Sequence, residues 1–108
     1  MYVLHIANRQ TSSWSLRAWL TFRQLEIPFE LAFHPFDEQG NSHADFRRFS
    51  PSGRVPCLHH DERVVWDSLA IIEYLAERHS EIWPEHVDAR CWARSACAEM
   101  HTGFSALR

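Results

Sequence analysis

The sequence predicts an α/β fold, because short β-rich apolar runs alternate with longer segments of helical periodicity. The predicted order is strand, helix, strand, short helix, two strands and a helix, followed by one more helix. The chain has 108 residues, 45% of them hydrophobic and 23% charged, which is the composition of a globular domain rather than of a disordered segment.

The first part of the chain is predicted to form a βαβ unit. Residues Tyr2 to Ala7 are short and largely apolar, as in a buried strand. Apolar residues recur at helical spacing between Trp14 and Leu25, and Ile27-Pro28 ends this helix. Phe29 to Phe33 alternates as a second strand. Because a helix connects the two strands, we expect them to be parallel with a right-handed crossover.

A hairpin and another helix follow a short helical or irregular segment at Ala44 to Phe49. Strands at Cys57–His59 and Arg63–Trp66 flank a polar turn, which predicts an antiparallel pair. The next helix is predicted from Ser68 to His79. Its inward-facing residues are expected to be Leu69, Ile72, Leu75 and Ala76.

The two junctions of this hairpin predict a ligand site. Val55-Pro56 enters the first strand, and a cis peptide bond is expected there because it would hold a backbone edge unpaired. Asp67-Ser68 provides a cap for the helix that follows. An unpaired edge beside a helix N-terminus, with Arg54 nearby, suits a small peptide-like anion.

The C-terminal part is predicted to belong to a second domain. Residues 80–86 are predicted to form a linker, with Pro84 as a helix breaker. From Val87 onward apolar residues recur at helical spacing, and a helix with one apolar stripe needs partners. We therefore expect residues 1–79 to form one domain and residues 87–108 to be the first helix of a truncated all-helical domain. The unpartnered stripe also predicts self-association as a homodimer.

Composition argues against several classes of partner. The net charge is −3 and Arg47-Arg48 is the only basic doublet, so no nucleic-acid surface is expected. Neither a membrane-spanning apolar run nor a signal-peptide pattern is present, and no membrane partner is expected. Three cysteines without a CxxC motif fit a reducing cytoplasm. The run His59-His60-Asp61 is better explained by a polar turn than by a metal site, so no metal is expected.

Three short motifs, in order and at matching spacing, resemble the glutathione transferase family. They are SSWSLRAWL at 12–20, PSGRVPCL at 51–58 and WDSLAIIEYLAER at 66–78. The resemblance implies a thioredoxin-like βαβ-α-ββα domain. The tail at 94–108 is similar to the first helix of the all-helical domain of the family, so the resemblance covers the first half of a typical member.

All eleven lysine-or-arginine positions are arginine, and this usage suggests a GC-rich, bacterial genome.

The resemblance also implies how glutathione would bind. The backbone of Val55, before a cis Pro56, would pair with the cysteinyl part of the tripeptide. Asp67 would pair with the γ-glutamyl ammonium group, and Ser68 would hold the γ-glutamyl carboxylate at a helix N-terminus.

Two further contacts are implied by position. Arg54 stands where family members have a glutamine or a lysine within reach of the ligand. The contact to the glycyl carboxylate usually comes from the loop before the second helix, where this chain offers Ser42 and His43.

The family reaction needs a thiolate, which a hydroxyl at the N-terminus of the first helix can stabilise. Serine classes place this hydroxyl five residues before a helical arginine; counting back from Arg17 gives Ser12, with Ser13 as the fallback. The SSxSxR pattern resembles the zeta class, but that class has cysteine where this chain has Trp14, which argues against isomerisation of maleylacetoacetate. The implied function is conjugation of glutathione, as co-substrate, to a small electrophilic apolar molecule.

Other interpretations remain open. Ordinary helix capping would also explain Ser12, Ser13 and the Asp67-Ser68 pair. Burial in a strand would explain Cys57. A non-catalytic glutathione-binding or dimerisation module is the main alternative function. A glutaredoxin-like oxidoreductase is less favoured, because residues 11–15 hold no cysteine.

Overall fold

The structure, a computed structural model, describes residues 1–7, 13–35 and 46–103. The predicted α/β order is confirmed over these residues. Of the segment predicted at Ala44 to Phe49, residues 46–49 lie within them. The elements are β1 (Tyr2–Ile6), α1 (Ser13–Gln24), β2 (Glu30–Phe33), β3 (Cys57–His60), β4 (Arg63–Trp66), α3 (Ser68–Ala76), the 3₁₀ helix η1 (Ser80–Ile82) and α4 (Val87–Gly103).

The four strands form one mixed sheet in the order β2-β1-β3-β4. As predicted for a βαβ unit, β1 and β2 are parallel, with Val3 opposite Glu30. Strand β3 is antiparallel to both of its neighbours, β1 and β4. Strands β1, β2 and β4 therefore end at the same edge of the sheet, and this is the edge at which β3 begins.

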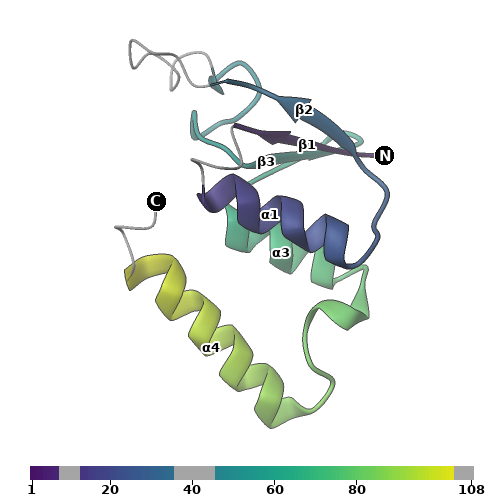
Figure 1. Ribbon diagram of the computed structural model, residues 1–108, viewed down its shortest axis with the longest axis vertical. Coiled ribbons are helices and arrows are strands. Elements are labelled where there is room, and N and C mark those ends of the chain that lie inside the picture. The colour runs from purple at the N-terminus through teal and green to yellow at the C-terminus, as the bar shows by residue number, and fades with distance from the viewer. Residues whose placement is uncertain (8–12, 36–45, 104–108) are drawn as a thin grey trace.

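Helices α1 and α3 cover one face of the sheet (Figure 1). Side chains alternate between faces along a strand, so Leu4 and Ile6 of β1 point to these helices together with Leu58 of β3. Each of these side chains is fully buried, which stabilises the fold by roughly 1.5–3 kcal/mol per residue. The core is completed by buried residues of α1, α3 and the loop after α1: Ala18, Phe22, Ile27, Ile71 and Leu75.

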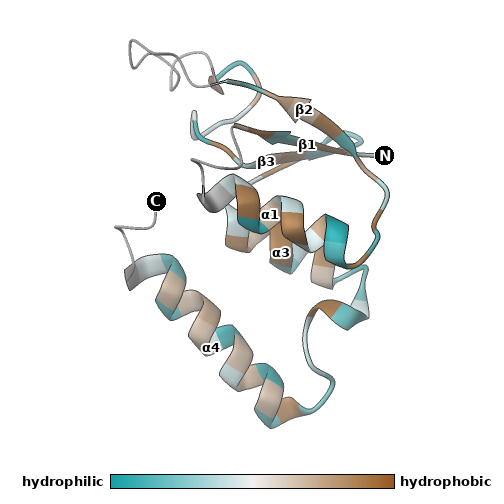
Figure 2. Ribbon diagram, viewed as in Figure 1, coloured by the Kyte–Doolittle hydropathy of each residue, from teal (hydrophilic) through white to brown (hydrophobic). Residues whose placement is uncertain are grey.

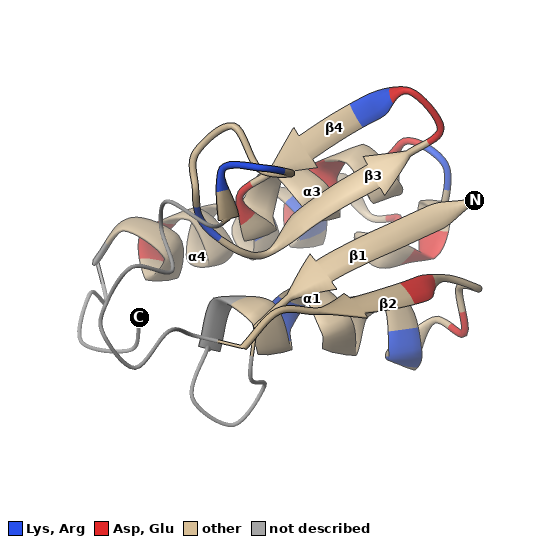
Figure 3. Ribbon diagram, turned by 90° about the horizontal axis from the view of Figure 1, so that it is seen from above, with Lys and Arg blue, Asp and Glu red and all other residues tan. Residues whose placement is uncertain are grey.

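The other face of the sheet carries aromatic and histidine side chains. His5 of β1 stacks on Phe49 with ring centroids 4.5 Å apart, and it lies 4.4 Å from the ring of His59 of β3. His34, just after β2, stacks on Phe49 at 4.1 Å. Figure 3 looks onto this face and shows the charged residues at the strand ends and in the loops, with the middle of the sheet uncharged.

Helix α3 differs from the prediction in its end and in its inward face. It ends at Ala76 rather than at His79. The sequence predicts Ile72 on the inward face, whereas Ile71 is fully buried and Ile72 is only partly buried. Adjacent helical residues lie about 100° apart around the helix axis, so the sequence alone does not decide which residue of an apolar pair faces inward. Packing on the sheet selects the row Ser68, Ile71 and Leu75.

Helix α4 lies beyond α3, on the side away from the sheet (Figure 1). Figure 2 shows it as paler than β2, because polar and weakly apolar residues alternate along it. A salt bridge joins it to α3, from Arg94 Nε to Glu73 Oε1 at 3.5 Å. Trp92 and Val87 are largely exposed. None of the helices in the described part of the chain is long and apolar enough to cross a membrane.

Candidate functional site

The candidate site lies at the edge where β1, β2 and β4 end. Because α1 follows β1 and α3 follows β4, both helices begin at this edge and direct their N-terminal amide groups toward it (Figure 1). The loop from Ser50 to Pro56 reaches the same edge before β3 begins. Two helix N-termini and one loop therefore converge, and such a place attracts anions.

The Val55–Pro56 peptide bond is cis, as the sequence predicts. Pro56 is buried and Val55 is half-buried. The pairing of β3 with β1 and β4 begins at Cys57, so Val55 lies outside both ladders. An extended peptide can pair with a backbone segment of this kind.

Hydrogen bonds inside the loop hold the backbone before Val55 in place. The buried hydroxyl of Ser50 donates to the carbonyl oxygen of Arg54 at 2.7 Å. The amide of Gly53, which has φ 70°, donates to the Ser50 carbonyl at 2.9 Å. The Arg54 amide donates to Ser52 Oγ at 3.2 Å, and the Arg54 side chain remains exposed. The loop therefore presents Arg54 to the solvent from a fixed backbone.

The start of this loop is tied to the aromatic face of the sheet. The carbonyl oxygen of Phe49 accepts a hydrogen bond from His59 Nε2 at 2.8 Å and a weaker one from Cys57 Sγ at 3.6 Å. Burial raises the pKa of the Cys57 thiol to about 11, although a hydrogen bond with Ser50 acts in the opposite direction. Cys57 is therefore a packing residue and a poor nucleophile at neutral pH.

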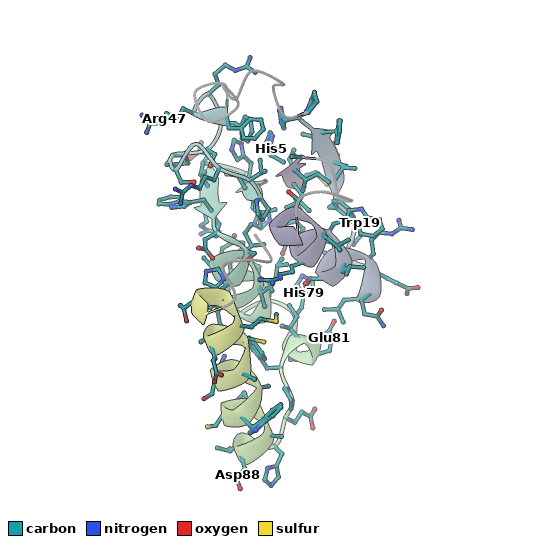
Figure 4. All side chains as sticks on the ribbon, turned by 60° about the vertical axis from the view of Figure 1, so that its left-hand side comes forward. His5, Trp19, Arg47, His79, Glu81 and Asp88 are labelled. Atoms are coloured by element: carbon teal, nitrogen blue, oxygen red, sulfur yellow. The ribbon has the colours of Figure 1, made fainter. Side chains whose placement is uncertain are left out.

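Two histidines complete this face. His5 Nδ1 lies 2.9 Å from His34 Nε2, so in the neutral pair one ring donates and the other accepts. Burial lowers the pKa of His5 to about 4, and the neighbouring His59 and His34 rings act in the same direction. Burial and the nearby Arg48 guanidinium also lower the pKa of His34. Figure 4 shows His5 at the end of the molecule opposite to Asp88 of α4.

Asp67 has the most unusual backbone of the site. It caps α3 with φ 81° and ψ 131°, and its side chain accepts a hydrogen bond from the Leu69 amide at 3.0 Å. A non-glycine residue in such a region costs on the order of 1–3 kcal/mol, and residues held this way cluster at binding and catalytic sites. Ser68, the first residue of α3, is buried beside it.

A contact that the sequence does not predict reaches Asp67 from α4. His101 Nε2 lies 3.0 Å from Asp67 Oδ1 and 3.0 Å from Asp67 Oδ2. The two residues are separated by 34 positions along the chain, and no local pattern connects them. Only the packing of α4 against α3 brings them together.

Several predicted site residues lie outside the described part of the chain. Ser12 and His43 are among them, as is Ser42. Ser13 is the first residue of α1, and its side chain is likewise outside the description. The structure therefore places Arg54, Val55, Pro56, Asp67 and Ser68 at one edge, and it leaves the predicted catalytic hydroxyls as predictions.

The histidines of the hairpin do not converge. His59 faces Phe49, whereas His60 Nδ1 contacts the Tyr74 hydroxyl at 2.6 Å on the other face of the sheet. Among the residues that the structure describes, no group of three histidine, cysteine or acidic side chains is arranged to hold a metal ion.

Comparison with known proteins assigns the family. Residues 11–78 match the family described as "Glutathione S-transferase, N-terminal domain". The chain belongs to this family. Its curated relatives include glutathione S-transferase GstB of Escherichia coli (strain K12), which is 30% identical over 107 residues, covering 89% of this chain and 51% of GstB. The maleylacetoacetate isomerase of Dictyostelium discoideum is 31% identical over 80 residues, covering 73% of this chain and 36% of the isomerase.

Solved structures show the same glutathione transferase fold. A glutathione S-transferase from Actinobacillus pleuropneumoniae superimposes with a TM-score of 0.84 at 26% identity, covering 98% of this chain and 50% of that one. A glutathione transferase homologue from Burkholderia, solved with bound glutathione, gives a TM-score of 0.79 at 24% identity, covering 96% and 57%. The chain thus spans about half the length of the relatives it matches.

Proposed function

We propose that the chain binds glutathione along the edge formed by Val55 and the start of α3. The observation that carries this proposal is the strained Asp67, directly before the helix N-terminus at Ser68. The Asp67 carboxylate would pair with the γ-glutamyl ammonium group, while Ser68 and the first amides of α3 would hold the γ-glutamyl carboxylate. The free backbone of Val55 would exchange hydrogen bonds with the cysteinyl residue.

The Burkholderia homologue and a second one from Sulfitobacter, both solved with bound glutathione, support this ligand. In the proposed complex the exposed Arg54 side chain lies within reach of the tripeptide. We assign the glycyl carboxylate to the loop that contains His43. The free state of all three cysteines agrees with a reducing cytoplasm.

The proposed reaction is conjugation. The hydroxyl of Ser12, or of its neighbour Ser13, donates a hydrogen bond to the sulfur of glutathione and favours the thiolate, near the positive end of α1. The sulfur attacks an electrophilic carbon of a small apolar substrate and forms a C–S bond. The leaving group departs with the electron pair of the broken bond.

A binding role without conjugation is the alternative, because the proposed contacts explain binding of glutathione and assign no described residue to the electrophilic substrate. We propose that residues 1–79 form the glutathione-binding domain, residues 80–86 a linker, and residues 87–108 the first helix of a helical domain that would supply the substrate pocket and a homodimer contact. The buried, high-pKa Cys57 gives no support to a glutaredoxin-like exchange.

Calorimetric titration with glutathione tests the binding step. We expect Asp67→Asn to weaken binding about tenfold, because it removes the charge that faces the ammonium group. The matched control is Asp88→Asn, an exposed aspartate in the first turn of α4, which should leave the affinity unchanged. A wild-type chain that fails to bind glutathione would refute the proposal.

Conjugation is tested separately with an activated aryl chloride, whose chloride leaves as the sulfur adds. Loss of turnover in Ser12→Ala, with glutathione affinity retained, is the expected result. Full turnover in this variant would transfer the role to Ser13. Binding without turnover in the wild type would favour the non-catalytic alternative. Maleylacetoacetate is the second substrate to assay, because one of the relatives is an isomerase of that name.

A further inference from the structure

The contact between His101 and Asp67 links α4 to the proposed γ-glutamyl site. Figure 1 shows the C-terminal end of α4 on the side of the molecule where α1 and α3 begin. His101 lies in the last turn of α4 and places Nε2 3.0 Å from each oxygen of the Asp67 carboxylate. The His101 side chain is 21% exposed, compared with 47% for Asp67, so the histidine is the more enclosed partner.

The chemistry of the two groups assigns the proton. An ionised carboxylate only accepts hydrogen bonds, so His101 Nε2 must carry the hydrogen and donate it. The Leu69 amide already donates to Asp67 Oδ1 at 3.0 Å. Two donors from different helices therefore fix the plane of one carboxylate. A carboxylate accepts about four hydrogen bonds, so acceptor positions remain for a ligand.

We propose that His101 is a positioning residue that holds the Asp67 carboxylate in the orientation that recognises the ammonium group of the bound tripeptide. The inference rests on the proposed glutathione site. Asp67 is about half exposed and, without His101, its side chain would keep only the Leu69 amide as a fixed partner among the contacts described above. Glutathione binding would then have to fix the orientation of the Asp67 carboxylate, at a cost in conformational entropy. Pre-organisation of the carboxylate by His101 removes that cost. A helix outside the sheet domain thereby contributes to selection of ligands with a free amino group.

Two ligands separate positioning from general stability. Glutathione carries the ammonium group, whereas glutaryl-cysteinyl-glycine is the same molecule with hydrogen in its place. Calorimetry of both ligands is performed on the wild type, His101→Leu and His101→Gln, whose amide retains an N–H donor. The matched control is Arg94→Met, which breaks the salt bridge of α4 to Glu73 on α3 and leaves the His101 contact in place.

We expect His101→Leu to weaken glutathione binding about fivefold and to change binding of the deaminated analogue less than twofold, because only the ammonium group uses the positioned carboxylate. His101→Gln should recover most of the lost affinity. Arg94→Met should leave the ratio of the two affinities at its wild-type value.

Four results would overturn the inference. An equal loss for both ligands in His101→Leu would mean that the histidine only supports the fold. Tighter binding of glutathione would mean that His101 competes with the ammonium group. Unchanged binding in His101→Leu, with a loss in Asp67→Asn, would refute the role of His101 and leave the proposed function intact. A wild type that binds neither ligand would refute both.

Discussion

The two faces of the sheet are built from the same strands and differ in almost every physical property. Toward α1 and α3 the sheet presents Leu4 and Leu58, which are fully buried among apolar side chains. On the other face lie His5 and His59, each next in sequence to one of these leucines. His5 stacks on the Phe49 ring, and His59 donates a hydrogen bond to the Phe49 carbonyl oxygen. The first face contributes the strand residues of the main hydrophobic core, whereas the second holds the loop that leads to the candidate site.

This difference follows from the alternation of side chains along a strand. The buried apolar residues of the first face carry no titratable group and are damaged by loss of volume. Only at the margin of that face does a histidine, His60, have a pKa that burial lowers, among the residues that the structure describes. A face of histidines is held by directed hydrogen bonds, so it responds to protonation. We therefore expect substitutions on the two faces to separate global stability from the placement of the ligand-binding loop.

The largest effect is expected on the apolar face. Leu58→Ala leaves a cavity under α1 and α3 and should lower the free energy of unfolding by about 2–5 kcal/mol. The matched control is Val64→Ala, because Val64 pairs with His59 on the other face and is 39% exposed. Urea titration followed by circular dichroism measures both variants. Equal losses would contradict the assignment of the core to one face.

An intermediate effect is expected when the histidine face is acidified. The pKa of His5 is lowered to about 4 from the ordinary value of 6.5, so the unfolded chain binds the proton more tightly. The free energy of unfolding should therefore fall as the pH drops from 6.5 toward 4, by on the order of 2 kcal/mol for His5. Burial is the main cause of the lowered pKa, with the His59 and His34 rings adding to it.

Urea titrations at several pH values measure this effect. His5→Phe keeps a ring against Phe49 and should remove most of the slope of the free energy of unfolding against pH. The remainder belongs to His34 and His60, whose pKa values burial lowers as well. Ser95→Ala is the control, because Ser95 is exposed on α4, carries no titratable group and should leave the slope unchanged. A slope that is equal in the wild type and His5→Phe would show that His5 is not the sensitive group.

The smallest effect on stability is expected in the loop itself. Ser50→Ala removes the hydrogen bond to the Arg54 carbonyl at 2.7 Å, which should cost about 1 kcal/mol of stability. Because that bond fixes the backbone before Val55, glutathione binding should also weaken, by about threefold. Ser95→Ala, at an exposed position of α4, is the control for both measurements. Unchanged glutathione binding in Ser50→Ala would separate the loop from the ligand site.

The sequence by itself determined the order of the elements and the short-range backbone features of the candidate site. Apolar periodicity, the Val55-Pro56 junction and the Asp67-Ser68 cap are short-range features, and each appears in the structure where the pattern predicts it. Helix α3 was the exception in two respects. It ends at Ala76 rather than at His79. Its inward residue is Ile71 rather than Ile72, since the two are equally apolar neighbours and only the packing on the sheet selects between them.

Tertiary structure alone decided which distant residues meet. The approach of His101 to Asp67 depends on the angle at which α4 packs on α3, and nothing near either residue encodes that angle. The stack of His5, His34 and Phe49 likewise requires two strands and a loop from separate parts of the chain. Periodicity assigns a residue to a face, but contacts between faces arise only when the whole core has packed.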